Sequence, residues 1–177
     1  MKNVVIVGAG KEGKGTFGDI FYENKWNITF IDKDENVINS LNEKNSYIVE
    51  ALYENYNEKH IIDHYHAYLI DDYTILNADV IVLALYPEDI KEALSKLKFS
   101  LQKRIKSNYE QKLTILCGTN KNHMMSKLEN FLLDDLKIEK EWYCSNVALR
   151  DMIIRRSSNS DAKDAVQLTT KIVQTLL

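Results

Sequence analysis

The chain opens on Lys2-Asn3-Val4-Val5-Ile6-Val7-Gly8-Ala9-Gly10-Lys11-Glu12-Gly13, and this stretch decides the fold. Residues 2–7 are mostly apolar and rich in β-branched side chains, which is typical of a buried strand. Three glycines with G-x-G-x-x-G spacing follow, and apolar residues then recur at helical spacing at Phe17, Ile20 and Phe21. A strand, a glycine loop and a helix in this order predict a turn that binds the diphosphate of a dinucleotide.

Each glycine of the loop has a physical reason to be there. Gly8 permits the tight turn after the strand, Gly10 has no β-carbon to keep a diphosphate away from the backbone, and Gly13 lets the helix pack close to the strand. The free amides at the start of the helix then face the phosphates. The candidate diphosphate-binding residues are therefore Gly8, Ala9, Gly10, Lys11, Glu12 and Gly13.

A second β-like run, residues 27–31, ends at Asp32, which lies 19 residues after Gly13. The dinucleotide fingerprint expects an acid there, which accepts hydrogen bonds from the adenosine ribose. A carboxylate at this place repels the additional phosphate of NADP, so NAD is the predicted cofactor. The adjacent Lys33 can offset that repulsion and keeps NADP open, and a plain structural turn is the alternative interpretation of the glycines.

Composition and charge limit the classes of protein to be considered. The 177 residues have 45% hydrophobic content, six glycines and one proline, which predicts one compact unit over residues 1–177. A net charge of −3 gives no electrostatic footprint for nucleic acid or anionic lipid. No apolar run approaches the roughly 20 residues of a membrane span, and Met1 leads directly into the first strand. With two cysteines, Cys117 and Cys144, the chain is expected to be cytoplasmic with reduced thiols.

Two β-rich runs, residues 46–53 and 60–69, flank the polar segment 54–58 and predict an inserted β-hairpin at about residues 46–70. The hairpin carries His60, His64 and His66. No cysteine joins them and the nearby acids lack ligand spacing, so we interpret them as surface or edge-strand histidines rather than a zinc site.

The most apolar strand is expected at residues 78–85, as in the centre of a parallel sheet. Because ligands lie outside the carboxyl ends of such strands, Ala84 and Leu85 should flank the cofactor. A strand at 112–117 leads to Asn120, which either points toward the nicotinamide or caps a helix at 123–133.

The remaining segments complete the expected order of elements. Helices are predicted at residues 34–44, 71–77, 88–107 and 162–177, and a last strand at 141–149. The fold class that follows is α/β, a doubly wound and mainly parallel sheet of the Rossmann type with an inserted β-hairpin.

Several blocks together resemble one family, the mannitol-1-phosphate 5-dehydrogenases and other polyol-specific long-chain dehydrogenases, in their amino-terminal domain. The matching blocks are Val7 to Gly15, Ile28 to Asp34, Leu41 to Tyr47, Ala84 to Pro87 and the strand before Asn120. The resemblance implies a cytoplasmic NAD-dependent oxidoreductase that interconverts a sugar phosphate and a polyol phosphate. It also implies that residues of the glycine loop hold the diphosphate and that Asp32 binds the ribose. Asn120 would then lie beside the nicotinamide and the substrate.

The sequence departs from the family pattern at several places. Lys14 stands where the family usually has Arg, Thr119 where it has an acid, and Leu149-Arg150-Asp151 where it has Val-Asp-Arg. The family's catalytic lysine lies in a Lys-x4-Asn-x2-His pattern of a second domain, and these 177 residues do not contain that pattern. We therefore expect the chain to bind the dinucleotide but to catalyse little alone, with a separate catalytic domain or a second copy as its partner. A free-standing NAD(H)-binding regulatory or sensor module is the alternative.

Overall fold

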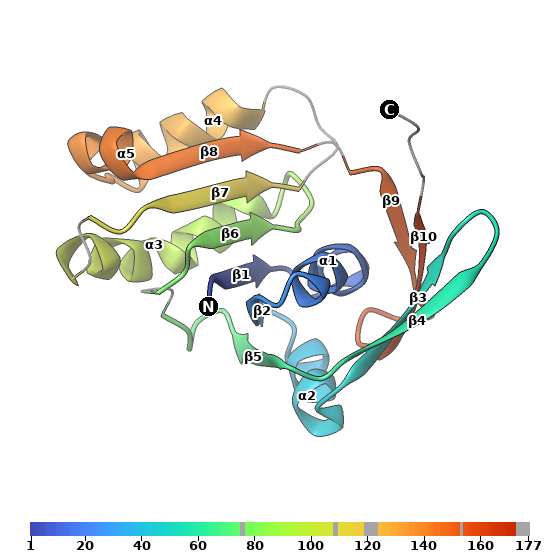
Figure 1. Ribbon diagram of the computed structural model, residues 1–177. Coiled ribbons are helices and arrows are strands. Elements are labelled where there is room, and N and C mark those ends of the chain that lie inside the picture. The colour runs from blue at the N-terminus through green and yellow to red at the C-terminus, as the bar shows by residue number, and fades with distance from the viewer. Residues whose placement is uncertain (75–76, 108–109, 119–123, 153, 173–177) are drawn as a thin grey trace.

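The computed structural model describes residues 1–74, 77–107, 110–118, 124–152 and 154–172. Its main sheet has six parallel strands in the spatial order β5-β2-β1-β6-β7-β8, as Figure 1 shows. This is the doubly wound order, which reverses direction at β1, and it confirms the predicted fold class. The strands are β1 (Asn3–Val7), β2 (Asn27–Asp32), β5 (Tyr65–Leu69), β6 (Val80–Leu83), β7 (Leu113–Cys117) and β8 (Val147–Asp151).

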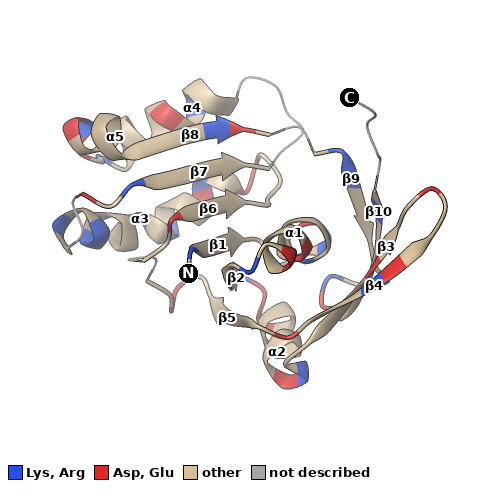
Figure 2. Cartoon of the chain, in the orientation of Figure 1, with Lys and Arg blue, Asp and Glu red and all other residues tan. Residues whose placement is uncertain are grey.

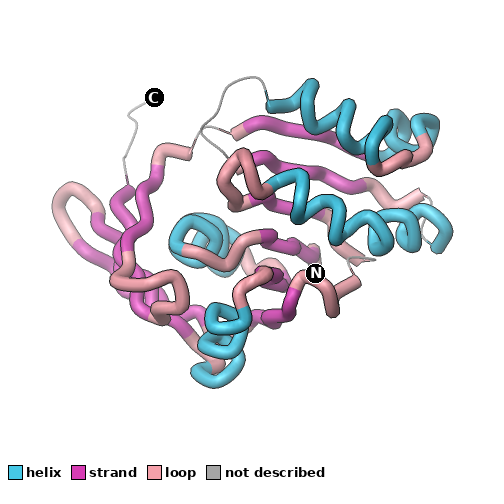
Figure 3. The backbone as a smooth tube through the Cα atoms, turned by 180° about the vertical axis from the view of Figure 1, so that it is seen from behind, coloured by secondary structure: helices cyan, strands magenta, loops and turns pink. Residues whose placement is uncertain are grey.

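Helices cover both faces of this sheet, and the view from behind in Figure 3 shows the second helical layer in front. One face carries η1 (Gly13–Gly18), a π-helical stretch that continues into α1 (Asp19–Glu23), and α2 (Glu35–Lys44). The other face carries α3 (Ile90–Ser107), α4 (Met124–Asn130), η2 (Phe131–Asp135) and α5 (Lys140–Asn146). Two apolar cores result, one on each side of the sheet.

A second, smaller sheet stands beyond the carboxyl ends of the main strands (Figure 1). Its order is β4-β3-β10-β9, with bounds β3 (Tyr47–Leu52), β4 (Asn57–Ile62), β9 (Arg156–Asn159) and β10 (Gln167–Ile172). β3 and β4 form an antiparallel hairpin, as predicted, while β3 pairs in parallel with β10. The hairpin is thus half of a mixed sheet that the last part of the chain completes.

Two elements predicted near this sheet were misplaced or wrong. Residues 65–69 were assigned to the hairpin, but they form β5 and pair with β2 in the main sheet. The helix predicted at 162–177 is wrong, because residues 167–172 form β10 between β3 and β9. Leu168 and Thr170 alternate inward along β10, so the period that decides the structure is two residues and not 3.6.

The strand predicted at 141–149 was also partly wrong. Residues 140–146 form α5, which buries Trp142, Tyr143 and Asn146 on one side, and β8 begins only at Val147. The described part of residues 71–77 contains no helix. Within the described residues, no helix combines the length and the apolar composition that crossing a bilayer requires.

Candidate functional site

A cleft of about 740 Å³ lies where β1, β2 and β6 end. The glycine loop forms its floor, the start of α3 one wall, and β9 of the second sheet another. Its volume is within the roughly 300–1,000 Å³ that small-molecule and cofactor sites occupy. In doubly wound sheets this edge, at the reversal of strand order, is where ligands bind.

Most of the residues that the sequence singled out line this one cleft. They are Gly8, Gly10, Lys11, Glu12, Asp32, Lys33, Ala84 and Leu85. Ala9 and Gly13 are buried beneath the loop and do not line the cleft. Asn120 lies outside the described residues, so its two interpretations stay predictions.

The three glycines of the loop meet three different surroundings. Gly8 has a φ of +96°, a left-handed conformation that favours glycine, and a β-carbon there would overlap the Ala84 carbonyl oxygen. A β-carbon at Gly13 would overlap the carbonyl oxygen of Gly8. At Gly10, in contrast, no atom of the described residues, apart from its chain neighbours, lies within 4 Å of the place where a β-carbon would be. Gly8 and Gly13 are therefore required for the shape of the turn, whereas the space beside Gly10 is open to the cleft.

Asp32 ties the glycine loop to the end of β2. Its Oδ2 accepts a hydrogen bond from the Ala9 amide at 2.7 Å, and its Oδ1 accepts one from the Asp34 amide at 3.0 Å. An ionised carboxylate has about four acceptor positions, so each oxygen retains one for a ligand hydroxyl. The side chain of Asp34, in turn, caps α2 by accepting a hydrogen bond from the Asn36 amide.

Lys33 is already paired with acids of the opposite wall. Its Nζ lies 3.2 Å from Asp89 Oδ1 and 3.0 Å from Glu92 Oε2, both near the start of α3. Hydrogen bonds to Glu92 and Asp89 raise the pKa of Lys33. The positive charge at this end of the cleft is thus matched by two negative charges.

β9 supplies a wall that sequence reasoning missed. Arg156 and Ser158 of β9 line the cleft together with Ile154, which lies just before the strand, while Arg155 is exposed. Ser158 donates its amide to Glu12 Oε1 at 3.2 Å, and its hydroxyl lies 2.9 Å from that of Thr16. These bonds hold β9 against the helix that follows the glycine loop. The alternation was too short to stand out in the sequence.

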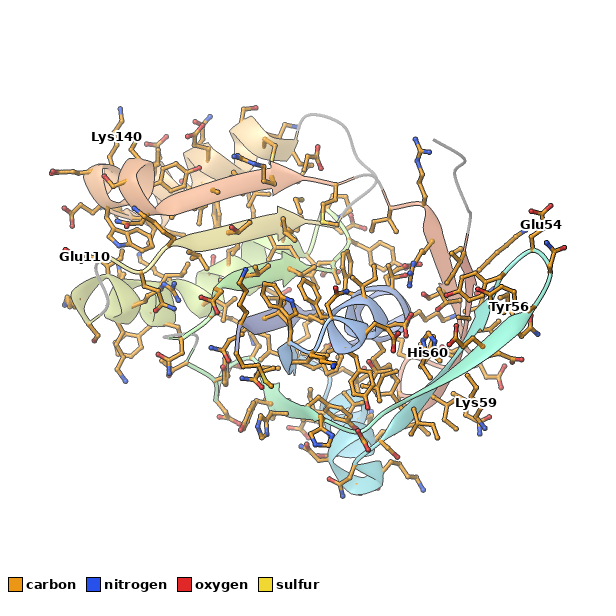
Figure 4. The ribbon with its side chains drawn as sticks, in the orientation of Figure 1. Glu54, Tyr56, Lys59, His60, Glu110 and Lys140 are labelled. Carbon is orange, nitrogen blue, oxygen red and sulfur yellow. The ribbon has the colours of Figure 1, made fainter. Side chains whose placement is uncertain are left out.

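A buried ion cluster joins this helix to the second sheet. Asp19, 1% exposed, accepts from Arg156 Nη1 at 2.9 Å through Oδ2, and its Oδ1 lies 2.5 Å from His60 Nδ1. Figure 4 shows His60 on β4, on the side that faces α1. Burial disfavours the charged imidazole, but the hydrogen bond and the negative charge of Asp19 outweigh it and raise the pKa of His60. His60 lies on the edge strand β4, as one of the two expectations had it, but its side chain is buried, whereas His64 and His66 are exposed.

The helix that follows the glycine loop, η1 with α1, is called the glycine helix below. Its Lys14 is fully buried against the turn before β10. Its Nζ donates to the carbonyl oxygens of Lys163 and Ala165 at 2.8 and 2.7 Å. Burial lowers the pKa of Lys14 to about 8, although the charges of Asp164 and Asp32 act in the opposite direction. The beginning of β9 and the turn between β9 and β10 are therefore both linked to the helix that follows the glycine loop.

The family model described as the mannitol dehydrogenase Rossmann domain matches residues 2–170. A curated relative, mannitol-1-phosphate 5-dehydrogenase of Thermoanaerobacter pseudethanolicus, is 30% identical over 139 residues, or 76% of this chain and 35% of the relative. The enzyme of the same name from Ajellomyces capsulatus is 32% identical over 96 residues, or 51% of this chain and 25% of that protein. The chain thus spans about a third or less of the length of these relatives.

Solved structures share the fold at low sequence identity. Octopine dehydrogenase with NADH and L-arginine matches with a TM-score of 0.73 and 8% identity, over 99% of this chain and 40% of that one. D-mandelate dehydrogenase with NADH has a TM-score of 0.60 and 16% identity, over 96% and 43%. Yersinopine dehydrogenase with NADP+ has a TM-score of 0.60 and 14% identity, over 97% and 39%. At these identities the likeness establishes the fold alone.

Proposed function

Because the chain belongs to the mannitol dehydrogenase family, whose Rossmann domain model matches residues 2–170, we propose that its cleft binds a nicotinamide dinucleotide for hydride transfer. The substrate we propose is a sugar phosphate or the corresponding polyol phosphate, because the curated relatives are named mannitol-1-phosphate 5-dehydrogenases. The observation that carries the proposal is that the open glycine, Gly10, and the acid after β2, Asp32, line one cleft.

The residues of the cleft fit the parts of a dinucleotide. The open approach at Gly10 lets phosphate oxygens reach the first-turn amides of the helix, which have no acceptor within the helix itself. The positive end of the helix dipole favours the same negative groups. Asp32, about half-buried, offers its remaining acceptor positions to ribose hydroxyls.

The charges around Asp32 favour NAD over NADP. A 2′-phosphate would lie near the Asp32 carboxylate, and Asp34 adds a second negative charge to the same part of the cleft. Lys33 does not offset them, because Asp89 and Glu92 already pair with its ammonium group. Two of the three N–H donors of Lys33 are engaged by these acids, so a phosphate would compete with them for the same positive charge.

When bound, the nicotinamide ring supplies the hydride. The chain's own residues bind and orient the cofactor, with Ala84 and Leu85 flanking it beyond the end of β6. Reduction of a carbonyl also needs a proton donor, and such general acid help is worth about 10²- to 10⁴-fold. The family's lysine pattern does not occur in these 177 residues, so we propose that they bind the cofactor and turn over little substrate alone.

Fluorescence titration of the 177-residue chain with NADH and with NADPH tests the proposal. We expect saturable binding of NADH, weaker binding of NADPH, and a smaller difference between the two in Asp32→Asn. Glu35→Gln is the matched control, because it removes one negative charge from an exposed side chain nearby that does not line the cleft. Equal affinities for both cofactors in the unmodified chain would refute the role of Asp32. Absence of any binding would refute the function itself.

The turnover proposal has its own measurement. We expect NADH and fructose 6-phosphate, incubated with the purified chain, to give no appreciable decrease of NADH absorbance. Rapid oxidation of NADH would show that residues of this chain supply the proton.

A further inference from the structure

We propose that Arg156 binds a phosphate group in the cleft and that the buried carboxylate of Asp19 holds its guanidinium ready for it. This inference rests on the proposed function, because the phosphate belongs either to the dinucleotide or to a phosphorylated substrate. It adds a binding residue from the second sheet, which lies outside the glycine-loop motif.

The position of β9 directs Arg156 toward the cleft. Arg156 and Ser158 share the face of β9 that lines it, and the bonds from Ser158 to Glu12 and Thr16 fix this face against the glycine helix. Figure 2 shows the beginning of β9 as a basic segment beyond the carboxyl ends of the main strands. A cation on this wall therefore faces the same space as the glycine loop.

The guanidinium is oriented but far from saturated. Arg156 donates one hydrogen bond to Asp19, from Nη1, and the Arg156 side chain keeps 26% of its surface exposed. A guanidinium has five N–H donors in a planar fork that suits two oxygens of one phosphate. Asp19 is itself 1% exposed and bonded to His60, so it cannot follow Arg156 outward. A cation fixed in advance loses little conformational entropy when a phosphate binds.

Arg156 is one of several cations that line the cleft, together with Lys11 and Lys163, but the two lysines of the opposite wall are already paired with acids. Lys33 is paired with Asp89 and Glu92, and Lys96 is paired with Asp71 at 2.8 Å. The lysines of the opposite wall thus already share their charge with surface acids, with which a phosphate would compete. Arg156 is paired with a carboxylate behind it, which leaves the outward side of the fork available to a ligand.

Arg155 provides a matched control. It carries the same charge one residue earlier, is exposed, and does not line the cleft. Arg156→Gln and Arg155→Gln therefore remove one positive charge each from adjacent positions. Arg156→Lys keeps the charge and removes the fork. Thermal unfolding of each variant shows whether it is folded before it is titrated.

Two titrations on the 177-residue chain distinguish the sources of the phosphate. In the first, NADH is titrated by fluorescence, with adenosine as the ligand that lacks phosphate. In the second, fructose 6-phosphate is titrated calorimetrically onto the NADH-saturated chain, with fructose as the ligand that lacks phosphate.

If the dinucleotide supplies the phosphate, we expect Arg156→Gln to lower the affinity for NADH at least 10-fold. If the substrate supplies it, we expect the affinity for fructose 6-phosphate to fall at least 10-fold. The affinities of Arg155→Gln should remain within twofold of the unmodified chain in both titrations. The affinities for adenosine and for fructose, which lack phosphate, should not change in any of the variants. If Arg156→Gln does not fold, Arg156→Lys carries the test, with an expected loss of at least threefold in one titration.

The inference is overturned if the unmodified chain binds NADH and the Arg156 variants match Arg155→Gln in both titrations; the proposed function then still stands. If the unmodified chain binds neither NADH nor fructose 6-phosphate, the proposed function and the inference fail together.

Discussion

Gly10 and Gly13 are both glycines and lie only three positions apart, yet the structure predicts opposite effects of substituting them. A β-carbon at Gly10 projects into open space, whereas one at Gly13 overlaps the Gly8 carbonyl oxygen. Gly10→Ala should therefore leave the free energy of unfolding within about 0.5 kcal/mol of the unmodified chain. Gly13→Ala should lower it by about 1–3 kcal/mol, as overpacking at a rigid backbone contact does.

The effect on dinucleotide binding should run the other way. A hydrogen bond between a backbone amide and a charged phosphate contributes about 1.5–3 kcal/mol. A change of 1.4 kcal/mol corresponds to a factor of ten in affinity. A methyl group at residue 10 that prevents one such hydrogen bond should therefore lower the affinity for NADH about 10-fold or more. Gly10→Leu, which extends further into the cleft, should weaken it beyond Gly10→Ala.

Urea unfolding and NADH titration of the three variants measure both quantities. The decisive observation is a separation of the two effects, with binding lost at residue 10 and stability lost at residue 13. Undiminished affinity in Gly10→Leu would mean that the glycine loop is a turn without a phosphate. Undiminished stability in Gly13→Ala would contradict the close contact between the helix and the strand.

Three further substitutions test the contacts around the glycine helix. Tyr47→Phe removes the buried hydrogen bond from the Tyr47 hydroxyl to the Lys14 carbonyl oxygen and should cost about 0.5–1.5 kcal/mol in urea unfolding. Folding raises the pKa of His60, so the protonated imidazole stabilises the folded state fully below pH 6.5, and this contribution is lost as pH rises through the folded pKa. His60→Gln should therefore lower the free energy of unfolding more at low pH than at high pH, and His66→Gln, at an exposed position, is the control. The pKa of Lys14 is lowered from 10.5 to about 8, so between these pH values the unfolded chain binds more protons and the free energy of unfolding rises with pH. Lys14→Met should remove that rise, and an equal rise in the variant and the unmodified chain would refute the prediction.

The first half of the main sheet could be predicted because its signals are local. Residues 3–7 and 27–32 are short apolar runs, and the glycine loop and Asp32 stand at fixed offsets from them. Each element is specified by neighbouring residues, and the parallel arrangement follows from the alternation of strands and helices. The same argument placed Ala84 and Leu85 at the cleft, because they follow the most apolar strand.

The second sheet could not be predicted in the same way. β10 pairs with β3, more than 100 residues earlier, and its short sequence Gln167–Ile172 is compatible with an amphipathic helix as well. What decides it is the burial of Leu168 and Thr170 against the second sheet and the glycine helix. Strand preference depends strongly on such tertiary partners, and a single sequence does not contain them in readable form.

Glu12 illustrates what this distant pairing means for the site. An acid in a loop that receives phosphates would repel them if its charge were free. In the structure its Oε1 accepts the Ser158 amide and its Oε2 accepts the Thr16 hydroxyl at 2.8 Å, so two donors hold the charge toward β9. A carboxylate that accepts such hydrogen bonds is better accommodated beside an anion than a bare one. The glycine loop can therefore carry an acid because β9 returns to cover it, and the same return places Arg156 on the wall of the cleft.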